Sequence, residues 1–173
     1  MTKQILKTPD NLLRQKSEEV VSFDKSLDGL VSDLTETLIS QTDPVGLGLS
    51  AVQIGVLKRV FVARVKNRIR HFVNPKILKF SKKEITFLEG CFSVPEFYGH
   101  VIRPTEIDLE AQDKHGKKTK GRYAGLPARI IQHEIDHLDG ILFTDHVHAQ
   151  NGKIFKIEKD KGGKEQLVEV AFA

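Results

Sequence analysis

The stretch His133-Glu134-Ile135-Asp136-His137 decides how this chain folds and which chemistry it can support. Two histidines four positions apart project from one face of a helix, where both rings can bind the same divalent metal ion. The glutamate between them then lies beside a water molecule activated by that ion, from which it can take a proton. This pattern is typical of metal-assisted hydrolysis of a carbonyl compound.

The residues around this stretch favour a helix that is buried along one side. Pro127 suits a first helical turn, and Gly140 follows the last turn as a stop. An apolar stripe along the span consists of Ile130, Ile131, Ile135 and Leu138. Two histidines and a glutamate in a buried helix would carry a large desolvation cost without partners, and a bound metal removes it. A chance match or a single core histidine explains the three residues together less well.

The only cysteine, Cys91, is the candidate for a further metal ligand. A catalytic metal site usually has three protein ligands and an open fourth position, and the helix supplies two of them. The cysteine lies in Glu89-Gly90-Cys91-Phe92-Ser93-Val94-Pro95, where a glycine and a proline bracket a short segment that can be held rigidly. A lone cysteine is an inert buried side chain, a reactive thiol or a ligand. The two-histidine helix favours the ligand.

Three motifs follow one another along the chain. They are Gly46-Leu47-Gly48-Leu49-Ser50-Ala51-Val52-Gln53, Glu89-Gly90-Cys91-Phe92-Ser93 and Gln132-His133-Glu134-Ile135-Asp136-His137. Together and in this order they resemble the peptide deformylases, which remove the formyl group from the N-terminal formyl-methionine of newly synthesised polypeptides and release formate. The resemblance extends over about residues 5–147, so it implies the same reaction for this chain.

The resemblance implies a role for six residues. It makes Cys91, His133 and His137 the metal ligands, Glu134 the general acid and base, and Gln53 and Phe92 the donors to the formyl oxygen. Gln53 would donate from its side-chain amide and Phe92 from its backbone N–H, and both would stabilise the negative charge that develops on that oxygen. The glutamate would take a proton from water and deliver it to the departing amine.

The resemblance also implies how substrate and metal are bound. In the family the first two motifs flank the substrate as added strands, so Gly46, Leu47 and Gly48 are expected to bind its main chain, although both glycines could equally be turn residues. One divalent metal ion per chain is expected. Family precedent indicates Fe(II), with Zn, Ni or Co able to replace it, because thiolate and imidazole suit all of these ions and availability decides among them.

The sequence departs from the usual family pattern at several positions. Ser50 stands where alanine is common, and Phe92 replaces a more frequent leucine. Tyr98 lies near the place where many bacterial relatives carry an arginine that contacts the substrate. After Val147 there is no long amphipathic helix; residues 153–157 and 166–170 instead predict a β-hairpin, which puts any contact that relies on such a helix in doubt.

The composition fits a single catalytic domain over residues 1–173. A chain of 173 residues with 39% hydrophobic content can bury a substantial core. No stretch approaches the ~18 apolar residues that cross a bilayer, and a lone metal-binding thiolate suits a reducing cytoplasm. The net charge is +4, but the lysines are spread along the chain. We therefore expect a cytoplasmic monomer that acts on N-formyl-methionyl nascent peptides, with a transient ribosome contact at most and no specific nucleic acid or membrane partner.

The order of elements predicts an α+β fold, with antiparallel sheets packed around a central helix that carries the His-Glu-x-x-His motif. Helices are expected over residues 9–15 and 27–41, and strands over 59–65, 70–73, 84–88 and 106–112, followed by a turn at 113–116 and another strand. His100, His115 and His148 are expected in loops or at edges, away from the metal.

Three charged residues near the motifs have open interpretations. Asp136 and Asp139 either steady the motif helix or a metal ligand, or they cap the helix and face solvent. Arg103 either pairs with an acidic group near the site or lies on the surface.

Three other functions compete with deformylation. A zincin-type metallopeptidase would also use two histidines and a glutamate, but its further ligand normally lies downstream of the helix. A metal-stabilised binding module would close the fourth position with a protein ligand, and Glu134 would have no role. The third alternative is a member of the family that acts on formylated substrates other than newly synthesised polypeptides.

Overall fold

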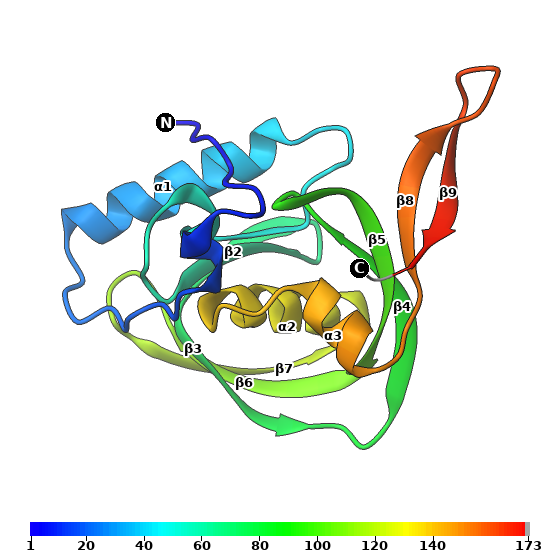
Figure 1. Cartoon of the computed structure of the whole chain (residues 1–173). Helices are drawn as coiled ribbons and strands as arrows, with labels where there is room; N and C mark the ends of the chain where they lie inside the picture. The colour runs from blue at the N-terminus through cyan, green and yellow to red at the C-terminus, as the bar shows by residue number, and fades with distance from the viewer. Residues whose placement is uncertain (172–173) are drawn as a thin grey trace.

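Helix α2 (Leu126–Leu138), which contains His133 and His137, lies between two antiparallel sheets in the computed structural model, which describes residues 1–171. Figure 1 shows the helix crossing the middle of the molecule, with strands of both sheets around it. The predicted α+β fold with a central motif helix is confirmed. The expected domain runs to residue 173, and its last two residues lie outside the described part of the chain.

The sheets are built almost entirely from neighbouring strands that pair antiparallel. The five-stranded sheet has the order β1-β2-β3-β6-β7, and the four-stranded sheet has the order β4-β5-β8-β9. Their bounds are β1 (Gly48–Ser50), β2 (Val60–Val65), β3 (Arg68–Phe80), β4 (Glu84–Cys91), β5 (Val94–Pro104), β6 (Glu106–Gln112), β7 (Lys118–Ala124), β8 (Ile154–Lys159) and β9 (Glu165–Val170). Strand β1 lies at an edge, so one side of its backbone stays open within residues 1–171.

The ends of helix α2 agree with the signals in the sequence. Gly125 precedes the helix with a φ of 64°, Pro127 lies in the first turn, and Asp139 caps the end. The apolar side of the helix packs into a buried cluster that includes Phe61, Phe72, Ile107, Leu109, Ile131 and Leu138. Each side chain of this size contributes about 1.5–3 kcal/mol when fully buried. The cluster therefore holds the helix on the five-stranded sheet and fixes the direction of its polar side.

Helix α1 (Lys25–Ser40) confirms the amphipathic helix predicted over residues 27–41. It begins after Asp24, whose carboxylate accepts a hydrogen bond from the Ser26 N–H at 2.9 Å. Its buried face packs against β1 and β2 through Leu27, Leu34, Leu38, Leu49, Val60 and Val62. The first predicted helix is shorter than expected, since only a 3-10 turn forms at Asn11–Arg14.

The C-terminal β-hairpin is confirmed as strands β8 and β9. Its turn is closed by Asp160, whose carboxylate accepts the N–H groups of Gly162 and Lys164 at 2.8 and 2.9 Å. The hairpin extends the four-stranded sheet and projects from the body of the molecule in Figure 1.

Two strands differ from their sequence prediction, and both contain a proline. Strand β5 was not predicted, yet it accommodates Pro95 near its exposed start and Gly99 where a Cβ would meet Val147 at 2.5 Å. Strand β3 was predicted to end at residue 73, but it continues through Asn74 and Pro75 by a bulge. Asn74 takes a φ of 48°, which asparagine tolerates.

A short helix and two histidine positions were also missed. Helix α3 (Phe143–Ala149) is only 7 residues long and is held by buried Phe143 and Val147, too short a span for a clear helical period. His148 therefore lies in a helix and His100 inside strand β5, and the expectation of loops or edges was wrong for both. His115 does lie in the predicted turn.

Candidate active site

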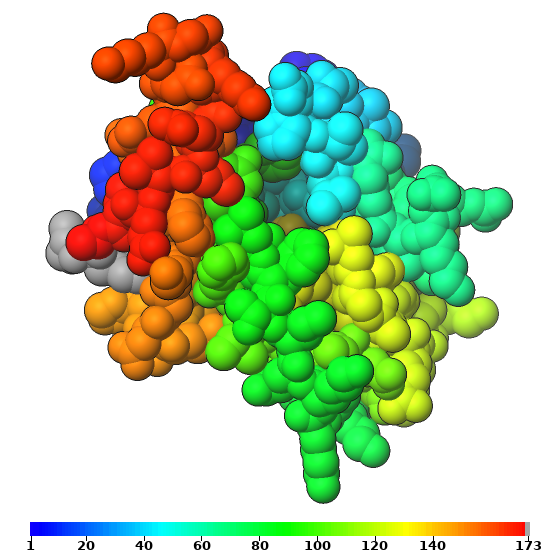
Figure 2. Space-filling view, turned by 90° about the vertical axis from the view of Figure 1, so that its right-hand side faces the viewer, coloured from blue at the N-terminus to red at the C-terminus, as the bar shows by residue number. Residues whose placement is uncertain are grey.

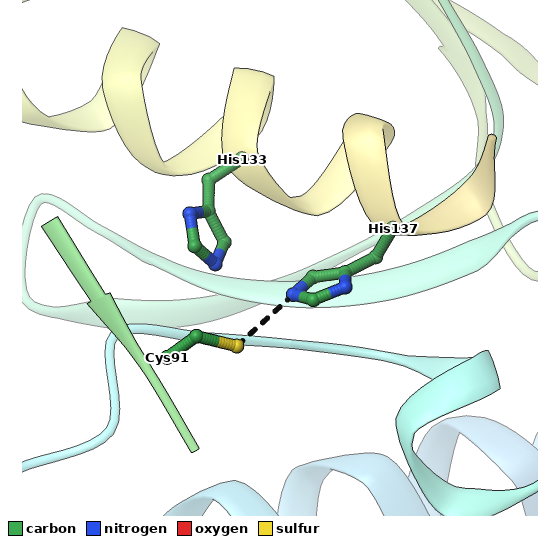
Figure 3. A group of neighbouring side chains, drawn as sticks. All are labelled: Cys91, His133 and His137. Atoms are coloured by element: carbon green, nitrogen blue, oxygen red, sulfur yellow. Dashed lines mark hydrogen bonds between the residues drawn. The ribbon is translucent and has the colours of Figure 1, made fainter. Parts of the chain in front are cut away.

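The end of strand β4 brings Cys91 to the polar side of helix α2. The β4–β5 hairpin pairs Cys91 with Val94 and leaves Phe92 and Ser93 as its turn. The Cys91 Sγ lies 3.2 Å from the Nε2 of His137. One donor atom from each of Cys91, His133 and His137 lies within 4.8 Å of the others, and Figure 3 shows the three side chains pointing toward one another. The structure thus brings together the three residues predicted as metal ligands.

The chemistry of these donors fits a divalent metal ion. The Nδ1 of His133 is paired with Glu89 at 3.0 Å, so its Nε2 is the nitrogen left for a ligand bond. Burial opposes ionisation of the Cys91 thiol, but His137 and His133 outweigh it and hold the pKa of Cys91 well below its ordinary value. A thiolate with two imidazole nitrogens is a donor set that zinc and ferrous iron accept.

A buried cluster of ion pairs holds His133 in place. Glu89 accepts hydrogen bonds from the Arg103 Nε at 2.6 Å and the Arg129 Nη1 at 2.6 Å, besides its contact with His133. Burial acts to raise the pKa of Glu89, but the hydrogen bonds from His133 and Arg103 outweigh it and keep the pKa well below its ordinary value. Glu89 is therefore an anion that orients the His133 ring.

The contacts of Arg103, Asp136 and Asp139 show which interpretation holds for each of these charged residues. Arg103 is 4% exposed and also donates to Asp136 at 2.8 Å, so it pairs near the site and does not lie on the surface. Asp136 in turn contacts the Nε2 of His146 at 2.9 Å. Asp139 is exposed and pairs with Arg59 at 2.7 Å, away from this cluster. The sequence reasoning assigned no role to Glu89 and Arg129.

Glu134 faces strand β1 from the same side of α2. Its carboxylate Oε2 accepts a hydrogen bond from the Ser50 hydroxyl at 2.7 Å, and the side chain is buried. Burial is the largest influence on Glu134 and raises its pKa above the ordinary value, although His133, His137 and Ser50 act in the opposite direction. A carboxyl group with a raised pKa is suited to both taking and giving a proton near neutrality.

Gln53 points its amide toward the same place. Its Nε2 lies 3.5 Å from the Cys91 Sγ and donates to the Ser93 hydroxyl at 3.1 Å, while its Oε1 accepts the Ser50 N–H at 2.9 Å. The side chain is 1% exposed, so Gln53 is a buried residue. Phe92 is the residue after Cys91 and lies in the hairpin turn. Its backbone N–H therefore directly follows the cysteine that carries the sulfur.

The first three residues of the first motif differ in how their backbone groups are used. Gly46 donates to the Gln41 carbonyl and accepts from Arg64, and the Leu47 carbonyl accepts the Arg64 N–H at 2.8 Å. Backbone groups of successive residues in a strand point to opposite sides. The N–H and C=O of Gly48 therefore point to the open edge of β1, where an extended peptide can pair.

The matches with known proteins agree with this arrangement. The sequence matches the model of the polypeptide deformylase family over residues 2–153. The chain belongs to this family. As a peptide deformylase it is a metal-dependent hydrolase that removes the formyl group from the N-terminus of newly synthesised polypeptides and releases formate. The metallopeptidase and binding-module alternatives are thereby excluded, and the β8–β9 hairpin lies beyond the matched residues.

Relatives and solved structures of this family resemble the chain over most of its length. The peptide deformylase of Rhizobium meliloti (strain 1021) is 39% identical over 150 residues, which are 84% of either chain, and that of Zymomonas mobilis is 40% identical over 162 residues, 88% of this chain and 90% of the relative. The crystal structure of a peptide deformylase from Legionella pneumophila has a TM-score of 0.79 at 39% identity and covers 84% of this chain and 86% of its own. That of a probable peptide deformylase from a Synechococcus phage has a TM-score of 0.77 at 43% identity and covers 84% and 99%.

The surface of this deformylase is hollowed beside the first motif. Figure 2 shows a hollow where the cyan segment after α1, the green β4–β5 hairpin and the yellow start of α2 meet. On the hairpin, a Cβ at Gly90 would meet the Tyr98 ring at 2.6 Å, so this ring covers the strand next to Cys91. Within residues 1–171 no helix is long and apolar enough to span a membrane.

The Gly48→Ala variant is expected to lower the rate of deformylation about 10- to 100-fold while the protein stays folded. A Cβ at Gly48 would meet the Glu134 Cδ at 2.8 Å, and the end of a side chain yields more easily than the backbone. The carboxylate would move, and small displacements of a reacting group have large effects on rate. The matched control is Gly29→Ala, since a Cβ at Gly29 meets nothing within 4 Å. Equal rates of formate release in the two variants would contradict the prediction.

Proposed function

We propose that Cys91, His133 and His137 bind one divalent metal ion per chain, and that this ion is Fe(II), with Zn, Ni or Co able to replace it. The single observation that carries the proposal is the convergence of a sulfur and two ring nitrogens within 4.8 Å. The low pKa of Cys91 supports it, because metal ligands must be deprotonated. When bound, the ion polarises the formyl carbonyl and lowers the pKa of a water molecule.

Glu134 is the general acid and base in this proposal. It takes the proton of the attacking water and delivers it to the amine that leaves as the C–N bond of the formyl group breaks. The proposal is supported by the buried position of Glu134, which follows His133 on helix α2. Burial raises the pKa of its carboxyl group, which suits a residue that must carry a proton for part of the cycle.

Gln53 and Phe92 stabilise the formyl oxygen while it carries negative charge. The amide of Gln53 reaches to 3.5 Å from the sulfur, and Phe92 follows Cys91 in a tight turn. Both donors are held before the substrate arrives, so they need little reorganisation during the reaction. Gly46, Leu47 and Gly48 flank the substrate main chain in this proposal. The open edge of β1 at Gly48 supports binding there, whereas the backbone N–H and C=O of Gly46 are already bonded to Gln41 and Arg64.

The proposal also includes the domain, the location and the partners of the enzyme. Residues 1–173 form one catalytic domain that works as a cytoplasmic monomer on N-formyl-methionyl nascent peptides. The net charge of +4 supports a transient contact with the ribosome, with no specific nucleic acid or membrane partner. Formylated compounds other than nascent chains are the second candidate substrates, and Tyr98, which stands where many relatives carry an arginine, is the residue that favours testing them.

The decisive experiment measures formate release by protein purified without oxygen. Formyl-methionyl peptides are compared with peptides that carry only internal amide bonds and with a small formylated amine. Treatment with a chelator is expected to abolish the release of formate, and Fe(II) or one of the other ions to restore it. Cleavage of internal amides, or full activity after the metal is removed, would contradict the proposal.

The Cys91→Ser variant is expected to retain about 10- to 100-fold less metal at equilibrium, since a serine hydroxyl is a harder and less easily ionised donor. The measurement is the metal content after dialysis against a competing chelator. Ser93→Ala is the control, because its hydroxyl lies beside Gln53 without belonging to the donor set. Wild-type metal content and activity in Cys91→Ser would remove Cys91 from the ligands.

A further inference from the structure

Strand β1 turns two of its three residues toward Glu134. Side chains alternate along a strand, so Gly48 and Ser50 share one face while Leu49 occupies the other. Leu49 is buried in the cluster that α1 forms with β2, and this fixes which face meets α2. The order glycine, leucine, serine along β1 thus places the Cα of Gly48 and the hydroxyl of Ser50 against the carboxylate of Glu134.

The Ser50 hydroxyl lies between two oxygens of the same residue. It is fully buried, 2.7 Å from the Glu134 Oε2 and 2.9 Å from the Glu134 main-chain oxygen. A hydroxyl has one hydrogen, and an ionised carboxylate is the stronger acceptor. The backbone of Ser50 is itself fixed, since its N–H donates to the Gln53 Oε1 at 2.9 Å. The hydroxyl therefore reaches the carboxylate from a rigid position.

The second carboxylate oxygen has a different environment. The Glu134 Oε1 is the atom closest to the position that a Cβ at Gly48 would take. Among residues 1–171 no hydrogen bond to Oε1 is formed, and Gly48 lies at the open edge of β1. The two oxygens are therefore not equivalent, because Oε2 is held by a hydroxyl, whereas Oε1 lies against the Cα of Gly48 and accepts no hydrogen bond from residues 1–171.

We propose that Ser50 is a positioning residue of this deformylase, which holds the Oε2 of Glu134 so that Oε1 is the oxygen that exchanges protons with water and the departing amine. This inference rests on the proposed role of Glu134. Loss of the hydroxyl leaves the carboxylate in place with greater freedom to rotate.

The test begins with Ser50→Ala, assayed on a formyl-methionyl peptide. The expected result is a kcat about 5- to 50-fold lower, with KM and metal content unchanged. Ser17→Ala is the control, because Ser17 is also buried and its hydroxyl has no hydrogen-bond partner within residues 1–171. A loss of metal or a raised KM in Ser50→Ala would overturn the proposal, as would a kcat equal to that of the control.

A double-mutant cycle separates positioning from a structural role. In Glu134→Asp the carboxylate is one methylene shorter and loses its contact with Ser50, so adding Ser50→Ala should change kcat less than about twofold. Rates are measured with enzyme in excess, so that slow variants remain readable. An equal factor in both backgrounds overturns the proposal. If Glu134→Gln and Glu134→Asp both keep the wild-type kcat, the proposed role of Glu134 fails instead.

Discussion

Replacing Glu134 with glutamine is expected to lower kcat for formate release by about 10²- to 10⁴-fold while the metal stays bound. Glutamine has the shape of glutamate and its side-chain oxygen can still accept the hydrogen bond that Ser50 donates at 2.7 Å. It cannot accept a proton from water or return one to the amine. The chemical step is therefore lost and the geometry of the site is kept. Steady-state rates and metal analysis of the same samples measure the two properties together.

The control for this variant is Glu165→Gln, a change of the same kind on the exposed C-terminal hairpin. It is expected to leave kcat, KM and metal content unchanged. A rate within about tenfold of wild type in Glu134→Gln would mean that another group moves the proton. Loss of metal together with activity would mean that Glu134 is needed for metal binding. The assignment of Glu134 as the general base would then have no support.

The sequence predicted the part of the site that depends on local spacing. His133 and His137 lie four positions apart, and this spacing alone places both rings on one face of α2. Cys91 could be chosen as the third donor because the chain has no other cysteine. The resemblance to the family led to the expectation that Gly48 binds the substrate main chain, and the structure places Gly48 in the edge strand β1. In each case the signal lay in a few neighbouring residues or in a residue type that occurs once.

The sequence did not predict contacts that join distant segments without a local pattern. Glu89, Arg103 and Arg129 come from β4, β5 and α2, and no periodicity marks charged residues that meet only in the folded chain. Ser50 was read as a tolerable replacement for alanine, because the position of its hydroxyl against Glu134 depends on how β1 packs on α2. Strand β5 was missed for a related reason, since Pro95 lies at its exposed start and Gly99 lies where Val147 leaves no room for a Cβ, and both facts appear only in the folded chain.

The Arg103→Met variant is expected to lose about 3–5 kcal/mol of stability. Arg103 is 4% exposed and donates to Glu89 at 2.6 Å and to Asp136 at 2.8 Å, so its loss removes a cationic partner from the buried Glu89 and from the partly buried Asp136. Methionine keeps much of the apolar stem, which limits the effect of lost packing. Because Glu89 also orients His133, metal affinity should fall about 10- to 100-fold. Chemical unfolding of the metal-free protein measures the first effect, and chelator competition the second.

The matched control is Arg122→Met, which removes an exposed arginine whose ion pairs with Glu106 and Asp108 should contribute less than about 1 kcal/mol.

The pH dependence of stability separates the effect of the Arg103 charge from the effect of its packing. The pKa of Glu89 is lower in the folded chain than its ordinary value of 4.5, so its stabilising effect is complete above that value and is lost as the pH falls below it. Without Arg103 the folded pKa of Glu89 rises, and the loss of stability in acid should be smaller than in the wild type. An unchanged acid dependence in Arg103→Met would show that the ion pair does not set the charge of Glu89, and the instability would then have to come from packing.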